Sequence, residues 1–375
     1  MSAPLRPILL CLILSLFGNP SLFPGNHQTG NLRAQQSLSV TAKDLVPSLT
    51  LGYLTDTLFP TIESVHYDST TNYVYTANIN GYFLDKDGNG TISRLRPDGT
   101  EISPNWITGL DAPTGLCVHE GKLYTTDIDR LVIIDIASAS ITSTIPIPGA
   151  TALNDVTVDP TGNVYLSDTG GNKIFKVSEG IPQVYVDSIQ TPNGLDFHDG
   201  VLFAVLWSPR ELVVINKQQE IYRWPTNIPQ SDGLQVLPNG DFLVSSWGGG
   251  VYYLARPRFW GGKSSRTGNI QLLLPSRQEN TKSPDVFFIP KANQLLVPSF
   301  DGNQLKSYHL YFSEDSTIPY LIPAAALGGH GLRRVTNSAD PERELYQQQQ
   351  FQGAEIAVYV IASETKTAAY EGYPI

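Results

Sequence analysis

A strand-turn-strand pattern that recurs about every 40 residues is the feature that most constrains the fold of this chain. Each copy has a polar or turn residue, a short alternating strand, a Gly/Asn/Asp turn and a second strand rich in Val, Leu and Tyr. The clearest copy is "NDVTVDPTGNVYLSD". The six copies begin, at intervals of 51, 40, 39, 39 and 52 residues, at Glu63, Thr114, Asn154, Asn193, Asp232 and Pro284.

The third copy displays a complete unit, because four strand-like runs follow one another at residues 154–159, 164–169, 173–178 and 183–187. Four short antiparallel strands per repeat of about 40 residues are typical of a propeller blade. The pattern therefore predicts an all-β protein, a six-bladed β-propeller with four-stranded antiparallel blades around a central channel, at residues 45–313. Residues 35–60 are expected to supply a closing strand to the last blade. A composition with 32 Gly, 27 Pro and 18 Tyr agrees with a turn-rich β protein.

Both ends of the chain fall outside the repeats. Residues 1–34 contain Arg6, an apolar run over residues 8–17 and then Gly-Asn-Pro, which favours a secretory signal peptide over a membrane span. We therefore expect a secreted or periplasmic protein that has no membrane contact after the signal is removed. Residues 314–375 form a C-terminal extension of uncertain structure and are a candidate binding site for a protein partner. Within the extension, residues 342–352 are compatible with a helix and residues 354–364 with a strand.

Cysteine content and charge exclude several classes of protein. Cys117 is the only cysteine outside the expected signal peptide, so a disulfide framework is excluded, and its apolar neighbours indicate a core residue. The net charge of −10 argues against a nucleic-acid partner and is compatible with cation binding.

The first residues of the six copies are candidate ligands for a cation. The first strand of every propeller blade lines the channel, so the repeat brings these six positions around one axis. Four of them offer carboxylate or carboxamide oxygens, which suit Ca²⁺ or another divalent cation better than zinc: Glu63, Asn154, Asn193 and Asp232. Asn-Asp, Asn-Gly and Asp-Gly are also ordinary turn dipeptides, but their recurrence in phase favours a metal site. Asp155 is expected to face away from this site and to support the blade, because strand residues alternate between faces.

The segments "LNDVTVDPTGNVYLSD", "TPNGLDF" and "SDGLQV", which follow Glu63 in the chain, resemble the gluconolactonase, senescence marker protein (regucalcin) and diisopropyl fluorophosphatase family of six-bladed propellers. "GLDAPTGLCV" and "GATALNDVTVD" are similar to an exported bacterial branch of that family. The resemblance implies a metal, calcium or a similar ion, held by Glu63, Asn154, Asn193 and Asp232. It also implies that Asp232 is a catalytic general base or nucleophile toward a lactone, ester or phosphoester.

Other catalytic motifs give no support to a different enzyme class. "DKDGNG" copies half of an EF-hand loop, but Arg96 stands where the bidentate Glu belongs. "WGGKSS" lacks the leading Gly of a phosphate loop, and neither G-x-S-x-G nor H-E-x-x-H occurs.

Two hypotheses of function follow from the sequence. The first is an exported calcium-dependent hydrolase of the lactonase type, whose substrate is a small lactone or ester. The alternative is a non-catalytic propeller that binds a ligand or a protein and keeps the metal as a structural tie, since one fold hosts many functions. Pro284 favours the alternative because it leaves the sixth position without a side-chain ligand.

Overall fold

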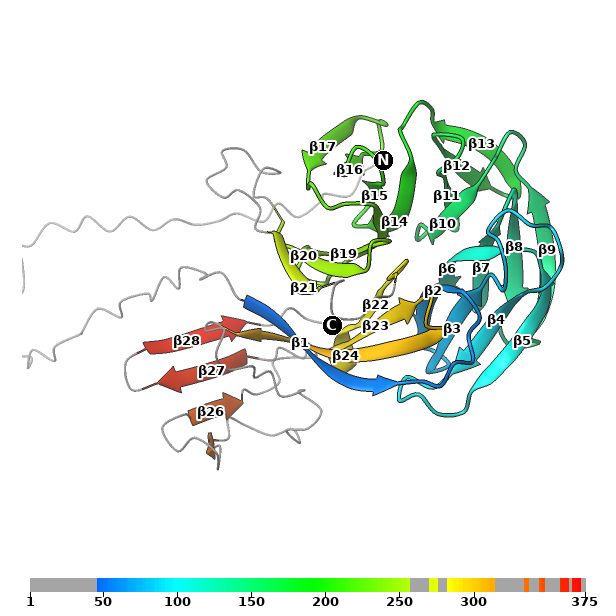
Figure 1. Ribbon diagram of the computed structural model, residues 1–375. Coiled ribbons are helices and arrows are strands. Elements are labelled where there is room, and N and C mark those ends of the chain that lie inside the picture. The colour runs from blue at the N-terminus through cyan, green and yellow to red at the C-terminus, as the bar shows by residue number, and fades with distance from the viewer. Residues whose placement is uncertain are drawn as a thin grey trace, which may run out of the picture. The chain divides into compact units, whose positions relative to one another are not determined.

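In the computed structural model, six four-stranded antiparallel sheets form a ring (Figure 1). The structure describes residues 46–256, 270–275, 282–313, 334–336, 344–347, 358–363 and 366–371. The expected signal peptide therefore lies outside the described residues. The ring confirms the predicted all-β, six-bladed propeller.

The first five blades each consist of four strands that pair in chain order. Blade one contains β2 (Ile62–Asp68), β3 (Tyr73–Asn78), β4 (Gly90–Leu95) and β5 (Ser103–Leu110). Blade two contains β6 (Pro113–His119), β7 (Lys122–Asp127), β8 (Arg130–Asp135) and β9 (Ser140–Pro146). Blade three contains β10 (Leu153–Val158), β11 (Val164–Asp168), β12 (Lys173–Ser178) and β13 (Ile181–Val186). Blade four contains β14 (Pro192–His198), β15 (Val201–Leu206), β16 (Glu211–Ile215) and β17 (Ile221–Pro225). Blade five contains β18 (Ser231–Val236), β19 (Phe242–Ser246), β20 (Gly250–Leu254) and β21 (Ile270–Leu274).

Blade six combines the two ends of the repeat region. It contains β22 (Phe287–Ile289), β23 (Gln294–Ser299), β24 (Gln304–Ser313) and the N-terminal strand β1 (Val46–Leu54). β1 pairs antiparallel with β24, with Thr50 opposite His309. This confirms the expected closing strand and covers an edge that would otherwise be open. β22 is short, and Pro284, which precedes it, has no N–H to donate to a ladder.

The apolar core is divided among the blade interfaces. One cluster of buried side chains lies between each pair of neighbouring blades, because the inner faces of adjacent sheets pack on each other. The six clusters include Ile92 with Leu123, Leu131 with Phe175, Ile174 with Leu202, Phe203 with Val244, Val251 with Leu295, and Leu296 with Ile62. The axis of the propeller is instead lined by the polar residues at which the first strands begin.

The C-terminal extension contains a separate antiparallel sheet. Its strands pair in chain order: β25 (Arg334–Thr336), β26 (Glu344–Gln347), β27 (Val358–Ser363) and β28 (Lys366–Glu371). The strand expected within residues 354–364 is confirmed by β27. The helix expected over residues 342–352 is wrong at β26, where pairing with β27 overrides a weak helix propensity. Among the described residues, no helix is long and apolar enough to cross a bilayer.

Candidate metal centre in the channel

The first strands carry a backbone irregularity where they enter the channel. In blades two to five, two residues of the first strand lie opposite one residue of the second, and blade one has a related register shift at Glu63. In blade three, for example, Asn154 and Asp155 lie opposite Ser167. A β-bulge of this kind turns side chains away from strict alternation. The two residues at each of these bulges therefore belong to a strand and do not form an isolated turn.

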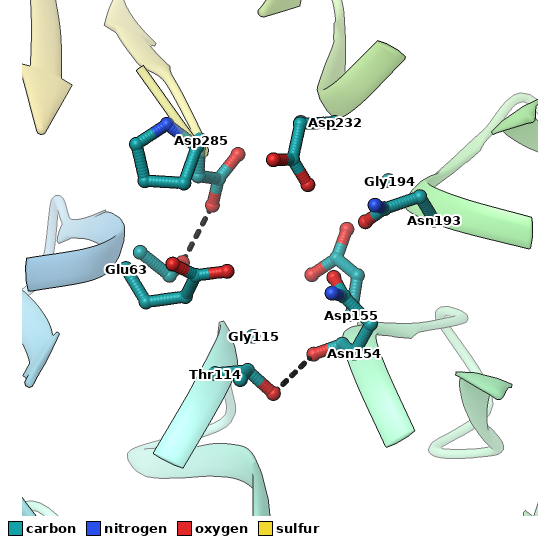
Figure 2. A pocket seen from close by; sticks show the side chains of 12 residues that line it. Glu63, Thr114, Gly115, Asn154, Asp155, Asn193, Gly194, Asp232 and Asp285 are labelled. Atoms are coloured by element: carbon teal, nitrogen blue, oxygen red, sulfur yellow. Dashed lines mark hydrogen bonds between the residues drawn. The ribbon is translucent and has the colours of Figure 1, made fainter. Parts of the chain in front are cut away.

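The bulges bring the six predicted positions together around one small space. Twelve residues line it, namely each first residue of a copy and the residue that follows (Figure 2). The space measures about 10 Å³, which is close to the volume that a single water needs. Glu63, Asn154, Asn193 and Asp232 all line it, as do Thr114 and Pro284.

We call the twelve residues that line this space the ring. Three of their oxygen atoms are buried and have no hydrogen-bond partner. They are Oε2 of Glu63, Oδ1 of Asn193 and Oδ2 of Asp232, in side chains that are 7%, 1% and 3% exposed. Unsatisfied buried polar atoms are costly and call for an explanation. A cation within the ring would supply the missing partner to all three.

The acidic groups of the ring repel one another when they are ionised. Burial, helped by the Asp285 carboxylate and opposed by the Lys282 ammonium, raises the pKa of Glu63 to about 8. Burial and the nearby carboxylates of Glu63 and Asp285 also raise the pKa of Asp232, against a hydrogen bond from the Asn193 side chain. Without a bound cation, the ring therefore favours protonated carboxyl groups.

A second layer of carboxylates lies next to the ring. Asp155 and Asp285 line the small space and also a larger cavity of about 300 Å³ farther along the channel. The expectation that Asp155 faces away is wrong, because the bulge turns both Asn154 and Asp155 toward the channel (Figure 2). Asp285 was missed, although "PDV" repeats the Asp-Val of "NDV" at the same position in the copy.

The second layer also ties neighbouring blades together. Oδ2 of Asp155 accepts a 2.6 Å hydrogen bond from the N–H of Leu195 in blade four. Asp285 accepts a hydrogen bond of 2.5 Å from the hydroxyl of Ser64 in blade one. These two acids therefore hold the first strands in place around the ring.

Hydroxyl side chains on the second strands satisfy the backbone of the bulges. Thr126 Oγ1 accepts from the N–H of Gly115 at 2.9 Å, Ser167 Oγ accepts from that of Asp155 at 2.8 Å, and Ser245 Oγ accepts from that of Gly233 at 2.7 Å. The hydroxyls of Thr126 and Ser245 donate onward to the Asn154 and Pro284 carbonyls of the next blade. A small hydroxyl residue opposite the bulge therefore fixes its backbone.

Close packing of the first strands explains the glycines in "NGL" and "DGL". A Cβ on Gly194 would lie 2.3 Å from the carbonyl oxygen of Asp232, and one on Gly233 would lie 2.7 Å from the Cα of Asp285. Any side chain here would push the blades apart. Glycine is consequently required by the approach of the neighbouring blade.

The chemistry of the ring suits a hard cation. Its ligands would be two carboxylates and two carboxamides, the oxygen donors that calcium prefers. Among the described residues, no group of three or more His, Cys, Asp or Glu side chains has the arrangement of a metal site. A site for zinc, which prefers His and Cys ligands, is therefore not supported there.

Together, the fold and the ring define a β-propeller with a small polar space at its axis. No protein-family model matches the sequence, and no curated protein is significantly similar to it. Solved structures do match. A gluconolactonase from Xanthomonas campestris is 16% identical with a TM-score of 0.53, covering 70% of this chain and 89% of its own.

Two further structures show the same architecture. A protein described as a candidate gluconolactonase is 17% identical with a TM-score of 0.52, over 71% of this chain and 93% of its own. A streptogramin B lyase is 14% identical with a TM-score of 0.50, over 70% and 98%. At these identities the similarity shows the fold, and the different activities in the names illustrate that the fold does not fix the reaction.

Proposed function

We propose that this chain is a calcium-dependent hydrolase of lactone or ester bonds, with the cation held by Glu63, Asn154, Asn193 and Asp232. The observation that carries the proposal is the set of three buried, unpartnered oxygen atoms around a space of about 10 Å³. The resemblance of the ring motifs to gluconolactonases and the fold shared with one support this choice of reaction.

The residues of the ring would serve in cation binding, in catalysis and in support of the site. Calcium bound there would act as a Lewis acid that polarises the carbonyl of the substrate. Asp232 is the proposed general base, because its carboxylate lines the space beside the proposed cation and the ring motifs resemble those of gluconolactonases. Asp232 would accept a proton from the attacking water. Asp155 and Asp285 would hold the ring in place through their bonds to neighbouring blades.

A second candidate is a non-catalytic propeller in which the cation only ties the blades together. The observations that favour it are the small size of the space and Pro284, which offers no side-chain ligand. Under this proposal, the ligand or protein partner would bind elsewhere on the molecule. Export through residues 1–34 and a partner site in residues 314–375 stay predictions.

One experiment separates the two candidates. Calcium binding is measured by calorimetry, and hydrolysis of a panel of lactones and esters is measured before and after chelation. For the hydrolase, chelation abolishes turnover and Asp232→Asn lowers kcat/KM at least about 100-fold. Asp135→Asn, at the C-terminal end of β8, is the matched control and keeps full activity. Calcium binding without any turnover would favour the structural cation, and activity that survives chelation would refute the calcium-dependent mechanism.

A further inference from the structure

A second set of residues, which directly follow the second strands, lies at the end of the channel where the first strands begin. In five blades, the residue after the second strand donates its backbone N–H to the carbonyl two positions before the ring residue, at 3.0 to 3.2 Å. These donors are Ile79, Thr169, Trp207, Trp247 and Phe300. Ile128 follows the second strand of blade two. We call these six residues the collar.

Five of the six collar residues are apolar, and contacts run from blade to blade among them. Ile79 and Ile128 share a buried cluster against which Phe300 packs. The rings of Phe300 and Trp247 lie 4.8 Å apart between centroids, and those of Trp247 and Trp207 lie 6.2 Å apart. The three aromatic residues are only half-buried. The collar therefore presents partly exposed aromatic surface at the end of the channel where the first strands begin.

Three polar side chains in or next to the collar are already engaged. The hydroxyl of Thr169 donates to the carbonyl of Pro192 at 2.6 Å, and that of Ser246 donates to the carbonyl of Pro229 at 2.5 Å. The Lys282 ammonium pairs with Asp301 at 3.0 Å and lies 4.9 Å from the centre of the Trp247 ring. A ligand rich in hydroxyl groups would find few free partners on these side chains.

An exposed apolar run lies on the β3–β4 loop, which joins the second and third strands of blade one at the same end. Tyr82, Phe83 and Leu84 are 57%, 46% and 38% exposed. The loop is anchored to blade two, because Lys86 pairs with Asp129 at 2.6 Å. Large contiguous patches of exposed apolar side chains mark binding surfaces.

We propose that the collar is a specificity-determining site that takes an apolar alkyl or aryl substituent on the lactone or ester. This inference rests on the proposed function, since it places the scissile carbonyl at the ring and the substituent against Trp207, Trp247 and Phe300. The hydroxyl groups of a polyhydroxylated sugar lactone would find few free partners on the collar side chains, so this lactone is expected to bind less tightly. The substrate class is consequently hydrophobic.

The test uses lactams, which resist hydrolysis, so that binding is measured independently of turnover. Calorimetry on the calcium-loaded full chain compares an unsubstituted lactam, a series with alkyl chains of increasing length, and a polyhydroxylated lactam. Affinity is expected to rise about fourfold for each methylene that the collar buries. Trp207→Ala and Trp247→Ala should each lower the affinity for the longest-chain lactam at least about tenfold. The affinity for the unsubstituted lactam should be unchanged.

Matched controls separate the collar from general destabilisation. Trp224→Ala removes a half-buried tryptophan from β17 of the same blade as Trp207 and should leave all affinities unchanged. Trp207→Phe keeps an aromatic ring and should retain most of the affinity even if Trp207→Ala fails to fold. Hydrolysis of the matching alkyl lactones is measured in parallel, and the loss should appear mainly in KM.

The outcomes distinguish this inference from the proposed function. Tighter binding of the polyhydroxylated lactam, affinity that is independent of chain length, or collar variants that behave like Trp224→Ala would overturn the inference. Hydrolysis with no preference for alkyl chains overturns it too, while leaving the hydrolase proposal intact. Chain-length-dependent binding without any turnover supports the collar and refutes the hydrolase.

Discussion

The hydroxyl of Ser64 donates a hydrogen bond of 2.5 Å to Oδ2 of Asp285, and so joins the first blade to the sixth across 221 positions of sequence. Ser64 is 1% exposed. Asp285 also accepts hydrogen bonds from the backbone N–H groups of Val286 and Val65. This contact lies next to the candidate cation site and closes the ring at its axis.

Ser64→Ala is expected to lower the free energy of unfolding by about 2 kcal/mol, because a buried bond to a carboxylate is lost. Urea unfolding at saturating calcium provides the measurement. Ser138→Ala is the control, since its hydroxyl bonds the exposed Asp135 carboxylate at 2.6 Å, and it should change stability by less than about 0.5 kcal/mol. Equal effects of the two variants would contradict a closing role for Ser64.

Glu63→Gln is expected to raise the melting temperature of the chelated protein and to abolish the further rise that calcium produces. The substitution keeps the volume of the side chain while it removes the cost of placing an acid in this site, which comes first from burial and then from the Asp285 carboxylate. It also removes one charged ligand, so the linkage between calcium binding and stability is lost. Melting curves with and without calcium test this. A variant that calcium stabilises as much as the wild type would exclude Glu63 as a ligand.

Asp196 in the larger cavity is expected to make stability depend on pH. Burial raises its pKa from 3.8 to about 6, against the N–H of Val236 and the charge of His198. Asp155, Asp285 and Cys117 also interact electrostatically with it. Since the folded protein holds the proton more tightly, this stabilising contribution is complete below about pH 4 and is lost as the pH rises through 6.

Asp196→Asn should therefore gain stability relative to the wild type between about pH 4 and pH 6, with no further gain above about pH 7. Chemical unfolding at several pH values in chelator measures the difference. Asp135→Asn is a control of opposite sign, because hydrogen bonds from Ser138 lower the pKa of Asp135. A difference for Asp196→Asn that is flat with pH would refute the assignment.

Deletion of β1 is expected to leave the propeller open and prone to aggregation. The deletion removes Val46–Leu54 and exposes the backbone edge of β24. Size-exclusion chromatography and the melting temperature provide the readouts. A chain that starts at residue 42 keeps β1 and should remain monodisperse. A stable monomer without β1 would show that closure does not require this strand.

The sequence predicts the blades because each blade is a local unit. The strands of blade three lie within two residues of their expected bounds, since alternation and turn residues act over a few positions. Recurrence of the same unit places Glu63, Asn154, Asn193 and Asp232 at equivalent points, and the structure brings them around one space. Features that recur at the same position of each copy can therefore be predicted from the sequence.

The orientation that strict alternation predicts for Asp155 is wrong for a physical reason. Strict alternation puts Asn154 and Asp155 on opposite faces, whereas the bulge turns both toward the channel. The bulge is fixed by Ser167 on the next strand and by the contact of Asp155 with Leu195 in the next blade. Neither partner is adjacent in sequence, so a pattern of nearby residues cannot reveal it.

The sequence by itself determined the number of blades, the closing strand and the set of oxygen donors at the axis, because these follow from periodicity and residue chemistry. Only the tertiary structure decided which further side chains face that axis. Asp285 is joined to blade one by its hydrogen bond with Ser64, and the ring of Trp247 contacts those of Trp207 and Phe300, because closing a propeller brings together residues from separate blades. Ring closure is a long-range event, and its contacts are set by packing between sheets.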